Sequence, residues 1–518
     1  MGRFKLHSML ISAGRAQTLL FNVRQSMMSS CRLFHSSLLP EGGKAFINGK
    51  WVAATSGNQF EVLDPYTHEI LCDVSNCEVT DAKQSVAAAR QAFEKWSLET
   101  TAKQRGGILR KWFEIFTERE GELAELLSRE QGKPLTEARG EIQYSSSFFD
   151  WYSGEARRIY GQIIEPAVLN RQHFHTREPI GVVALITPWN FPSAMIARKA
   201  AAALAAGCTL VVKPAEDTPL SALALAQTAK DAGLPDGVFN VIPSDRANAS
   251  AISKYLCSSN DVDAISFTGS TAVAKLLLQQ SASTVKRVCL ENGGNAPLIV
   301  FPSADIGKAV KGTMASKFRC SGQTCVSANR VLVHKSVHDE YIAQLEKEMK
   351  TSLVMGCGMD KGVTQGPLIN KKAVEKVRSL LDDATSKGAR IIIGGKSPEG
   401  SNLFEPTLLE DVTGDMEIAH QEIFGPVIAV QNFETEEEVL KIANSSRSGL
   451  AGYIFTSDAG QIYRVSRRLQ VGMLGVNEGL MSCAEAAFGG VKESGLGREG
   501  GPQGIDEFTQ WKYVCIQH

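Results

Sequence analysis

Two cysteines, Cys320 and Cys325, lie five positions apart in the polar segment KFRCSGQTCVSANR. Cys325 follows a Gly-Gln-Thr turn and precedes a strand-like run, so we expect its sulfur on a loop that opens into a cleft. A cysteine thiolate is the strongest common nucleophile near neutral pH, provided that its surroundings lower its pKa. The segment alone leaves open a metal pair, a disulfide, a structural cysteine, or one nucleophile beside an uninvolved thiol.

The spacing of the cysteines argues against a metal site. Neither CSGQTC nor CDVSNC has the two-residue spacing or the neighbouring histidines typical of zinc ligands, and we expect no metal. The chain holds eleven cysteines without a compact framework. This pattern favours free thiols in a reducing compartment.

Two polar residues stand where strands are expected to end. Glu291 closes KRVCLE, before NGGN, and burial there would raise its pKa toward that of a general base. A salt-bridged strand-end glutamate is the alternative. Asn190 lies in ITPWNFP between an aromatic residue and a proline, where its amide could donate to a developing oxyanion. An Asx-type turn is the alternative for this residue.

The surrounding elements form two alternating blocks. From residue 180, strand-like runs such as IGVVALITP and CTLVVKPA alternate with helical runs, which predicts crossover units and a parallel sheet. Ligands of such sheets bind at the carboxyl ends of strands. A second block beginning near residue 293 predicts a second α/β domain. Upstream, residues 46–71 read as short strands and turns, and the segments 81–96 and 103–133 read as amphipathic helices.

Composition limits the remaining function classes. The chain has 518 residues and 21% charged residues, and no run of about 18 apolar residues suggests a membrane span. Residues 1–40 contain five basic residues, seven serines and no acidic residue, which predicts a mitochondrial transit peptide and a matrix location. A tail without a targeting role is the alternative. The remaining body has 50 basic and 56 acidic residues, so we expect no nucleic-acid partner.

Seven separated motifs point to one family: ITPWNFP, KPAEDTP, SFTGST, LENGG, GQTC, EIFGP and FGGVKESGLGREGG. In this order and spacing they resemble the NAD(P)-dependent aldehyde dehydrogenase superfamily, from about residue 45 to the C-terminus. The resemblance implies an α/β fold with a Rossmann-like NAD-binding domain, a second α/β catalytic domain and a small β arm for oligomerisation. The implied boundaries are 41–158 with 180–291 for the first domain, 292–504 for the second, and 159–179 with 505–518 for the arm.

The resemblance also assigns roles. Cys325 would be the nucleophile and Glu291 the general base, while Asn190 and the backbone amide of Cys325 would form the oxyanion hole. NAD is the implied cofactor although the usual G-x-G-x-x-G does not follow a strand of the first alternating block, with its pyrophosphate at the helix that starts after FTGS. The carboxylate of Glu216 would accept bonds from ribose hydroxyls and repel the 2′-phosphate of NADP. The residues expected to contact the cofactor are Trp189, Lys213, Glu216, Gly269, Ser270 and Glu422.

Substrate residues follow from the same resemblance. Arg198 interrupts an alanine-rich helix, Arg319 lies six residues before Cys325, and Ser482 follows the VNEGL loop. These positions match the carboxylate-binding positions of the family, and guanidinium groups recognise a planar carboxylate bidentately. Phe488 would form an apolar wall. For each arginine taken alone, a solvated surface charge is the alternative.

The implied reaction is the oxidation of succinate semialdehyde to succinate in 4-aminobutyrate degradation, through a thiohemiacetal and a thioester on the cysteine. Another ω-carboxy or aliphatic aldehyde, such as glutarate semialdehyde, is the first alternative, because one methylene is worth only about 1–3 kcal/mol in a pocket. From other classes, a thioester-forming acyltransferase, an esterase and a non-catalytic relative remain alternatives. The arm segments read as exposed edges with aromatic residues, so we expect a homotetramer, with a homodimer as the alternative.

Two positions depart from the pattern of the family. Ala274 stands where GSTxxG ends in glycine, and Asn292 stands where leucine follows the base. We expect the first to tune cofactor affinity and the second to affect the rate of deacylation. Ser327 stands where relatives often carry a second cysteine. We therefore expect Cys320 to be a bystander and peroxide to act on Cys325 itself.

Overall fold

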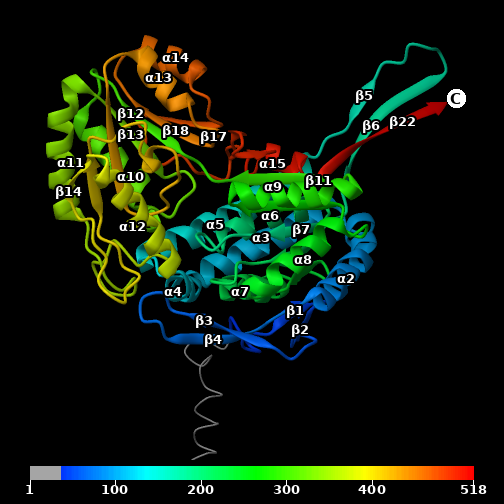
Figure 1. The fold of residues 1–518 in the computed structure, drawn as a ribbon. Helices are drawn as coiled ribbons and strands as arrows, with labels where there is room; N and C mark the ends of the chain where they lie inside the picture. Colours follow the sequence, from blue (N-terminus) through cyan, green and yellow to red (C-terminus); the bar gives the residue numbers. More distant parts are fainter. Residues whose placement is uncertain (1–36) are drawn as a thin grey trace, which may run out of the picture.

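The computed structural model describes residues 37–518, which form two α/β lobes and a projecting arm (Figure 1). The predicted transit peptide, residues 1–40, lies almost entirely outside the described residues. Within residues 37–518, no helix has the length and apolar character that crossing a bilayer requires.

The first lobe is built on an eight-stranded sheet of order β2-β1-β9-β8-β7-β10-β11-β21. Its central strands, β9 to β11, run parallel, which confirms the sheet predicted after residue 180. The order of strands along the chain reverses between β7 and β10, and ligands of open α/β sheets bind at such a point. The strands are β1 (Ala45–Ile47), β2 (Lys50–Val52), β7 (Val182–Ile186), β8 (Thr209–Lys213), β9 (Phe239–Val241), β10 (Ala264–Gly269), β11 (Arg287–Asn292) and β21 (Gly495–Leu496).

Helices cover both faces of this sheet because consecutive strand residues point to opposite sides. On β7, Val183 and Leu185 join the core shared with α3, α5, α6 and α7. Val182 and Ala184 join the core shared with α2, α8 and α9. These helices, with α4, are α2 (Val79–Leu98), α3 (Ala102–Glu118), α4 (Glu120–Gln131), α5 (Leu135–Glu155), α6 (Ala194–Ala206), α7 (Pro219–Asp231), α8 (Arg246–Ser258) and α9 (Thr271–Ser281).

The second lobe is built on a seven-stranded sheet of order β14-β15-β16-β13-β12-β18-β19. All neighbours in it are parallel except the edge strand β14, as the second alternating block predicts. Its elements are β12 (Ala296–Val300), α10 (Ile306–Phe318), β13 (Ala328–His334), α11 (His338–Ser352), α12 (Lys371–Ser386), β14 (Arg390–Ile393), β15 (Thr407–Glu410), β16 (Val427–Phe433), α13 (Glu436–Asn444), β18 (Ala451–Phe455), α14 (Ala459–Arg468) and β19 (Met473–Val476).

The arm joins the two segments predicted for oligomerisation. Strand β22 (Thr509–Gln517) pairs antiparallel with β6 (Arg171–Pro179) along its whole length, and β5 (Gln162–Ile164) pairs with the other side of β6. The resulting three-stranded sheet projects from the body (Figure 1). The smaller elements are β3 (Gln59–Leu63), β4 (Ile70–Ser75), β17 (Ser448–Gly449), β20 (Val491–Lys492) and α15 (Gln503–Asp506).

One sequence prediction about element boundaries is corrected. The run 103–133 is two helices rather than one, because Arg119, with φ −100° and ψ 16°, leaves helical geometry between α3 and α4. The extent of the second domain, 292–504, stays a prediction. Within that range, β21 pairs with β11 of the first sheet.

Candidate active site

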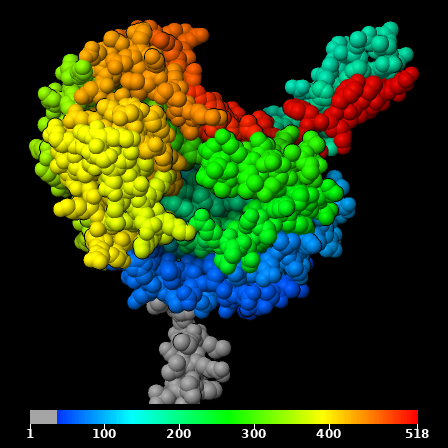
Figure 2. Space-filling model, viewed as in Figure 1, coloured from blue at the N-terminus to red at the C-terminus, as the bar shows by residue number. Residues whose placement is uncertain are grey.

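A cavity of about 500 Å³ lies between the two lobes, at the carboxyl ends of β7, β10 and β11. Figure 2 shows the face of the molecule hollowed between the yellow surface of the second lobe and the green surface of the first. Eleven of the thirteen predicted site residues line the cavity: Trp189, Asn190, Arg198, Gly269, Ser270, Glu291, Arg319, Cys325, Glu422, Ser482 and Phe488. Motifs from both domains therefore meet in one place.

The turn before Cys325 is fixed by close packing. Cys320 and Ser321 have φ of 53°, and Gly322 has φ of 76°. A Cβ at Gly322 would lie 2.1 Å from the carbonyl oxygen of Gly425, so that only glycine fits. The SGQTC and EIFGP segments thus pack against each other, and the half-buried Cys325 lines the cavity.

The protein alone does not lower the pKa of Cys325. Burial raises this pKa well above its usual value, and the carboxylates of Glu291 and Glu422 raise it further, while Arg198 and Arg319 lower it. The protein groups taken alone therefore do not meet the condition, stated above, that a reactive thiolate needs surroundings that lower its pKa. A positive charge brought into the cavity would favour the thiolate.

Glu291 has the environment of a base. Its side chain ends β11, is 2% exposed, and neither carboxylate oxygen has a hydrogen-bond partner. Burial raises the pKa of Glu291 to about 8, against the opposing effect of Arg198. Nη2 of Arg198 lies 3.9 Å from Oε2 of Glu291, so the two form an ion pair without a direct hydrogen bond, and the salt-bridged alternative holds in this weak form.

Asn190 connects the loop after β7 to the turn that carries the nucleophile. Its Nδ2 donates to the carbonyl oxygen of Gln323 at 2.9 Å. The partner lies outside the Asn190 loop, so the local Asx-turn alternative is not observed. Asn190 is 4% exposed and its Oδ1 has no partner. The side chain therefore presents its amide beside the Cys325 turn.

The two arginines differ in their surroundings. Arg198 is fully buried on α6, with its Nε 2.5 Å from Glu499 and its guanidinium 4.2 Å from the Phe488 ring. Burial lowers the pKa of Arg198, but Glu499 and other nearby groups together raise it above its usual value, so its charge is already faced by a carboxylate. Arg319 lines the same cavity, and among residues 37–518 no carboxylate lies within 4.0 Å of it. Arg319 is therefore the arginine better placed to bind an incoming carboxylate.

Glu422, Ser270 and Thr268, which line the cavity, have side chains suited to binding a dinucleotide. A Cβ at Gly293 would lie 2.4 Å from Oε2 of Glu422, so the glycine leaves room for a carboxylate that also accepts the Gly294 N–H at 3.1 Å. Burial raises the pKa of Glu422 to about 7. Ser270 caps the N-terminus of α9, and the buried Oγ1 of Thr268, two residues earlier on β10, has no hydrogen-bond partner. Unpaired polar atoms and a helix N-terminus suit ribose hydroxyls and a pyrophosphate.

Two predicted cofactor residues lie beyond the main cavity. Lys213 is buried and donates to the carbonyl oxygen of Pro214 at 2.9 Å, and burial lowers its pKa. Glu216 lines an adjoining cavity of about 970 Å³. Arg246 lines both cavities and so brings a positive charge to the cavity that Glu216 lines, which the sequence motifs did not predict.

The two departures from the family pattern cause little disturbance. The Nδ2 of Asn292 donates to the carbonyl oxygen of Glu493 at 3.0 Å, so it ties β11 to the segment before β21 and makes no bond to Glu291. Ala274 is buried in the first turn of α9, and its N–H donates to the Ser270 carbonyl at 3.0 Å as in a regular helix. Neither contact reorients the predicted base.

The side chain of Cys320 does not line the cavity. It is 1% exposed, accepts from Nε2 of Gln131 at 3.3 Å and lies 3.6 Å from the carbonyl oxygen of Asn190. Cys320 and Cys325 are both free thiols. Within residues 37–518, no group of three or more histidine, cysteine, aspartate or glutamate side chains could hold a metal.

For some residues of the site, the sequence motifs did not predict a role. Glu499 belongs to GREGG, yet nothing local shows that it pairs with Arg198 and Lys199 on α6. Lys133 and Glu141 form a buried ion pair behind Asn190. The only available signal was a charge at positions whose neighbours are apolar or small.

Comparisons with known proteins agree with this geometry. The pattern of the aldehyde dehydrogenase family matches residues 51–514. The chain is 51% identical over 493 residues to the mitochondrial succinate-semialdehyde dehydrogenase of Rattus norvegicus, covering 95% of this chain and 93% of the relative. It is 53% identical over 472 residues to the corresponding protein of Homo sapiens, covering 91% and 88%.

Solved structures are similar over nearly the whole chain. An NADP-dependent enzyme of E. coli matches with a TM-score of 0.91 and 46% identity, covering 93% of this chain and 99% of that one. Succinate-semialdehyde dehydrogenase of Burkholderia pseudomallei gives 0.90 and 47%, covering 92% and 98%. An NAD⁺ complex of an aldehyde dehydrogenase from Bacillus cereus gives 0.89 and 37%, covering 93% and 98%.

Proposed function

The chain belongs to the aldehyde dehydrogenase family, and on that premise we propose that it oxidises succinate semialdehyde to succinate with NAD. The observation that carries the proposal is one cavity that holds a thiol, a buried carboxylate and the guanidinium of Arg319, which has no carboxylate within 4.0 Å among residues 37–518. Relatives named for this activity are about half identical along nearly the whole chain. The main cavity and its neighbour also contain the residues that suit a nicotinamide dinucleotide.

The residues divide the chemistry between them. Cys325 attacks the aldehyde carbon, and the amide of Asn190 with the backbone N–H of Cys325 holds the oxyanion of the thiohemiacetal. The nicotinamide, when bound, supplies the hydride acceptor. Glu291 then takes a proton from the water that hydrolyses the thioester, for which a pKa of about 8 is well matched.

The substrate carboxylate is proposed to bind Arg319 and Ser482, with Phe488 as an apolar wall. Arg198 contributes from its position between Phe488 and Glu499, where its charge is partly compensated. A shorter or longer aldehyde differs by one methylene, worth about 1–3 kcal/mol. Comparing kcat/KM of the unmodified protein for succinate and glutarate semialdehydes tests the choice between them.

Replacing Arg319 by Ala is expected to raise KM for succinate semialdehyde about 10- to 100-fold, because a charge-assisted hydrogen bond is worth about 1.5–3 kcal/mol. KM for butanal, which lacks the carboxylate, should change little. Arg319→Lys is the matched control, since it keeps the positive charge but loses the planar guanidinium that binds a carboxylate bidentately. Equal losses on both aldehydes would show that Arg319 has a structural role.

The unmodified protein is expected to use NAD about 10- to 100-fold more efficiently than NADP at low salt, because Glu216 would repel a 2′-phosphate. Arg246 lines the same cavity and limits this preference. Glu216→Gln should therefore narrow the ratio of kcat/KM for NAD to that for NADP. Similar efficiencies of the two cofactors with the unmodified protein would contradict the choice of NAD.

A homotetramer is proposed from the arm. Apolar and aromatic side chains on it are exposed, with exposures of 85% at Ile163, 68% at Tyr160, and 54% at both Trp511 and Tyr513. Exposed strand edges with such residues pair with other chains. Light scattering at micromolar protein is expected to give the mass of four chains. The mass of one chain would rule out the proposal.

A mitochondrial matrix location is proposed as well. The basic, serine-rich composition of residues 1–40 supports it, and the rat and human relatives are mitochondrial proteins. A fluorescent fusion of residues 1–40 that stays in the cytosol would count against this location.

A further inference from the structure

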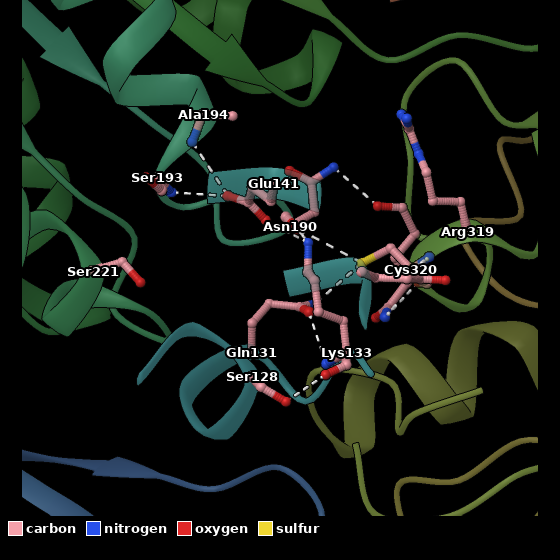
Figure 3. Close-up of polar contacts among 12 residues, drawn as sticks. Ser128, Gln131, Lys133, Glu141, Asn190, Ser193, Ala194, Ser221, Arg319 and Cys320 are labelled. Atoms are coloured by element: carbon pink, nitrogen blue, oxygen red, sulfur yellow. Dashed lines mark hydrogen bonds and ion pairs between the residues drawn. The ribbon is translucent and has the colours of Figure 1, made fainter. Parts of the chain in front are cut away.

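A buried ion pair lies behind the predicted oxyanion residue (Figure 3). Nζ of Lys133 donates to Oε2 of Glu141 at 2.6 Å and to the carbonyl oxygen of Asn190 at 2.7 Å. The side chains of Lys133 and Glu141 are 1% and 0% exposed. The same ammonium lies 3.8 Å from the centre of the Phe191 ring. One hydrogen bond and one cation–π contact therefore join the ammonium to the loop 190–191, and a second hydrogen bond joins it to Glu141.

Glu141 holds the other side of the same loop. Its Oε1 accepts the backbone N–H of Ser193 at 3.0 Å and of Ala194 at 3.2 Å, where α6 begins. A carboxylate at a helix N-terminus satisfies free N–H groups and interacts favourably with the helix dipole. The Lys133–Glu141 pair thus holds the backbone at Asn190 and at the start of α6 that follows it.

Through Asn190, the Lys133–Glu141 pair is also connected to the turn that carries Cys325. The Asn190 side chain donates to the carbonyl oxygen of Gln323, two residues before Cys325. The carbonyl oxygen of Asn190 lies 3.6 Å from the thiol of Cys320, which accepts from Gln131. Lys133, which binds the Asn190 carbonyl, therefore holds the Asn190 side-chain amide in its position relative to Cys325.

Stability alone is a weak reason for this arrangement. Taking two charges out of water costs several kcal/mol per ion, about as much as their attraction returns, and apolar residues of similar volume often replace such pairs without loss. The pair is instead bonded to the one loop whose geometry the reaction needs. A displacement of about 1 Å in a catalytic group can cost about 100-fold in rate.

We propose that Lys133 is a positioning residue for the oxyanion amide of Asn190, acting through the Asn190 carbonyl and through Glu141. The inference rests on the role of Asn190 in the proposed function. It does not depend on the identity of the aldehyde, because the experiment uses whichever aldehyde of a short panel the unmodified protein oxidises fastest. A failure with succinate semialdehyde would thus concern the substrate, and a failure among the variants would concern Lys133.

The first experiment replaces Lys133 by Met. We expect kcat to fall about 10- to 100-fold with KM for the aldehyde changed less than about threefold, because the interaction serves the transition state. Alkylation of Cys325 by iodoacetamide needs no oxyanion hole, so its rate should stay within about twofold. Slowing of alkylation in parallel with kcat would show general damage to the cavity and overturn the proposal.

Lys286→Met is the matched control. Lys286 also donates to backbone carbonyls, of Ser259 at 2.6 Å and Val262 at 2.8 Å, but does not line the catalytic cavity. Its loss should lower the melting temperature without the selective fall in kcat. Should Lys133→Met not fold, Lys133→Met with Glu141→Gln removes both charges, and the same readouts apply.

A double-mutant cycle decides whether Lys133 acts through Asn190. Asn190→Ala should lower kcat about 100- to 1000-fold, as does the loss of an oxyanion donor. Adding Lys133→Met to that variant should then cost less than about twofold, because no amide is left to position. If the double variant shows a fall in kcat equal to the product of the falls in the two single variants, the proposal is overturned.

Discussion

Replacing Cys325 by Ala is expected to lower aldehyde turnover about 10⁴- to 10⁶-fold, the scale of losing a catalytic nucleophile. Without the thiol no thiohemiacetal or thioester can form, and Glu291 would have only the aldehyde hydrate to act on. Steady-state NADH production with succinate semialdehyde measures the effect. Binding of NAD, followed by protein fluorescence, should persist because the cofactor residues are untouched.

Cys320→Ser is the matched control for that variant. A serine hydroxyl can keep the contacts to Gln131 and to the Asn190 carbonyl, so turnover should fall less than about tenfold. The same variant tests the redox prediction: peroxide should still inactivate it, and thiols should still rescue it at the sulfenic stage. Loss of that rescue would reveal a bridge between Cys320 and Cys325, and inactivity of Cys320→Ser would refute the assignment of Cys325.

Glu291→Gln is expected to stop the reaction after the first half. Thioester hydrolysis should slow about 100- to 10,000-fold because no base activates the water. A rapid burst of NADH equal to the enzyme present should remain, followed by almost no turnover. Stopped-flow absorbance separates the burst from the steady state. A variant that loses the burst as well would place Glu291 in the formation of the thiohemiacetal.

Glu291→Gln should also stabilise the folded state above about pH 4.5. Burial raises the pKa of Glu291 to about 8, whereas an unfolded chain loses this proton near pH 4.5. Between these values the folded state binds more protons than the unfolded state, so stability falls as pH rises. Glutamine removes that penalty. The melting temperature of Glu291→Gln should exceed that of the unmodified protein at pH 8.5 and match it near pH 4.5, and a lower value at pH 8.5 would contradict the argument.

For the unmodified protein, the same pKa has a kinetic counterpart. The base must be ionised to activate water, so thioester hydrolysis should accelerate as pH rises toward about 8. Stability and turnover therefore change in opposite directions with pH at this residue, a common cost of a buried catalytic group.

Local sequence patterns predicted the two parallel sheets and their alternation with helices. Hydrophobic runs such as IGVVALITP can only be strands buried on both faces, so their alternation with helices implied parallel sheets. Motifs at strand ends then placed Asn190, Gly269 and Glu291 together, because the carboxyl ends of parallel strands meet at one edge.

What the sequence did not reveal depends on distant partners. Arg198 was read as free to bind substrate, but it faces Glu499, which lies 301 positions further along the chain. In the sequence Lys133 and Glu141 look like ordinary solvated charges, but the fold buries them beside Asn190. The pKa of Cys325 likewise depends on which carboxylates share its cavity. Spacing along the chain holds no information about such pairs.

The pairing of β21 with β11 has a consequence for biosynthesis. Asn292 and Glu493, which are bonded beside this pairing, lie 201 positions apart. At about 5–20 residues per second on the ribosome, about 10–40 s pass between the synthesis of β11 and that of its outer neighbour β21. During that interval the strand that bears Glu291 presents an open edge, to which other nascent chains can pair. Chains terminated before residue 495 would keep this edge open permanently, so they should aggregate rather than persist as weakened enzymes.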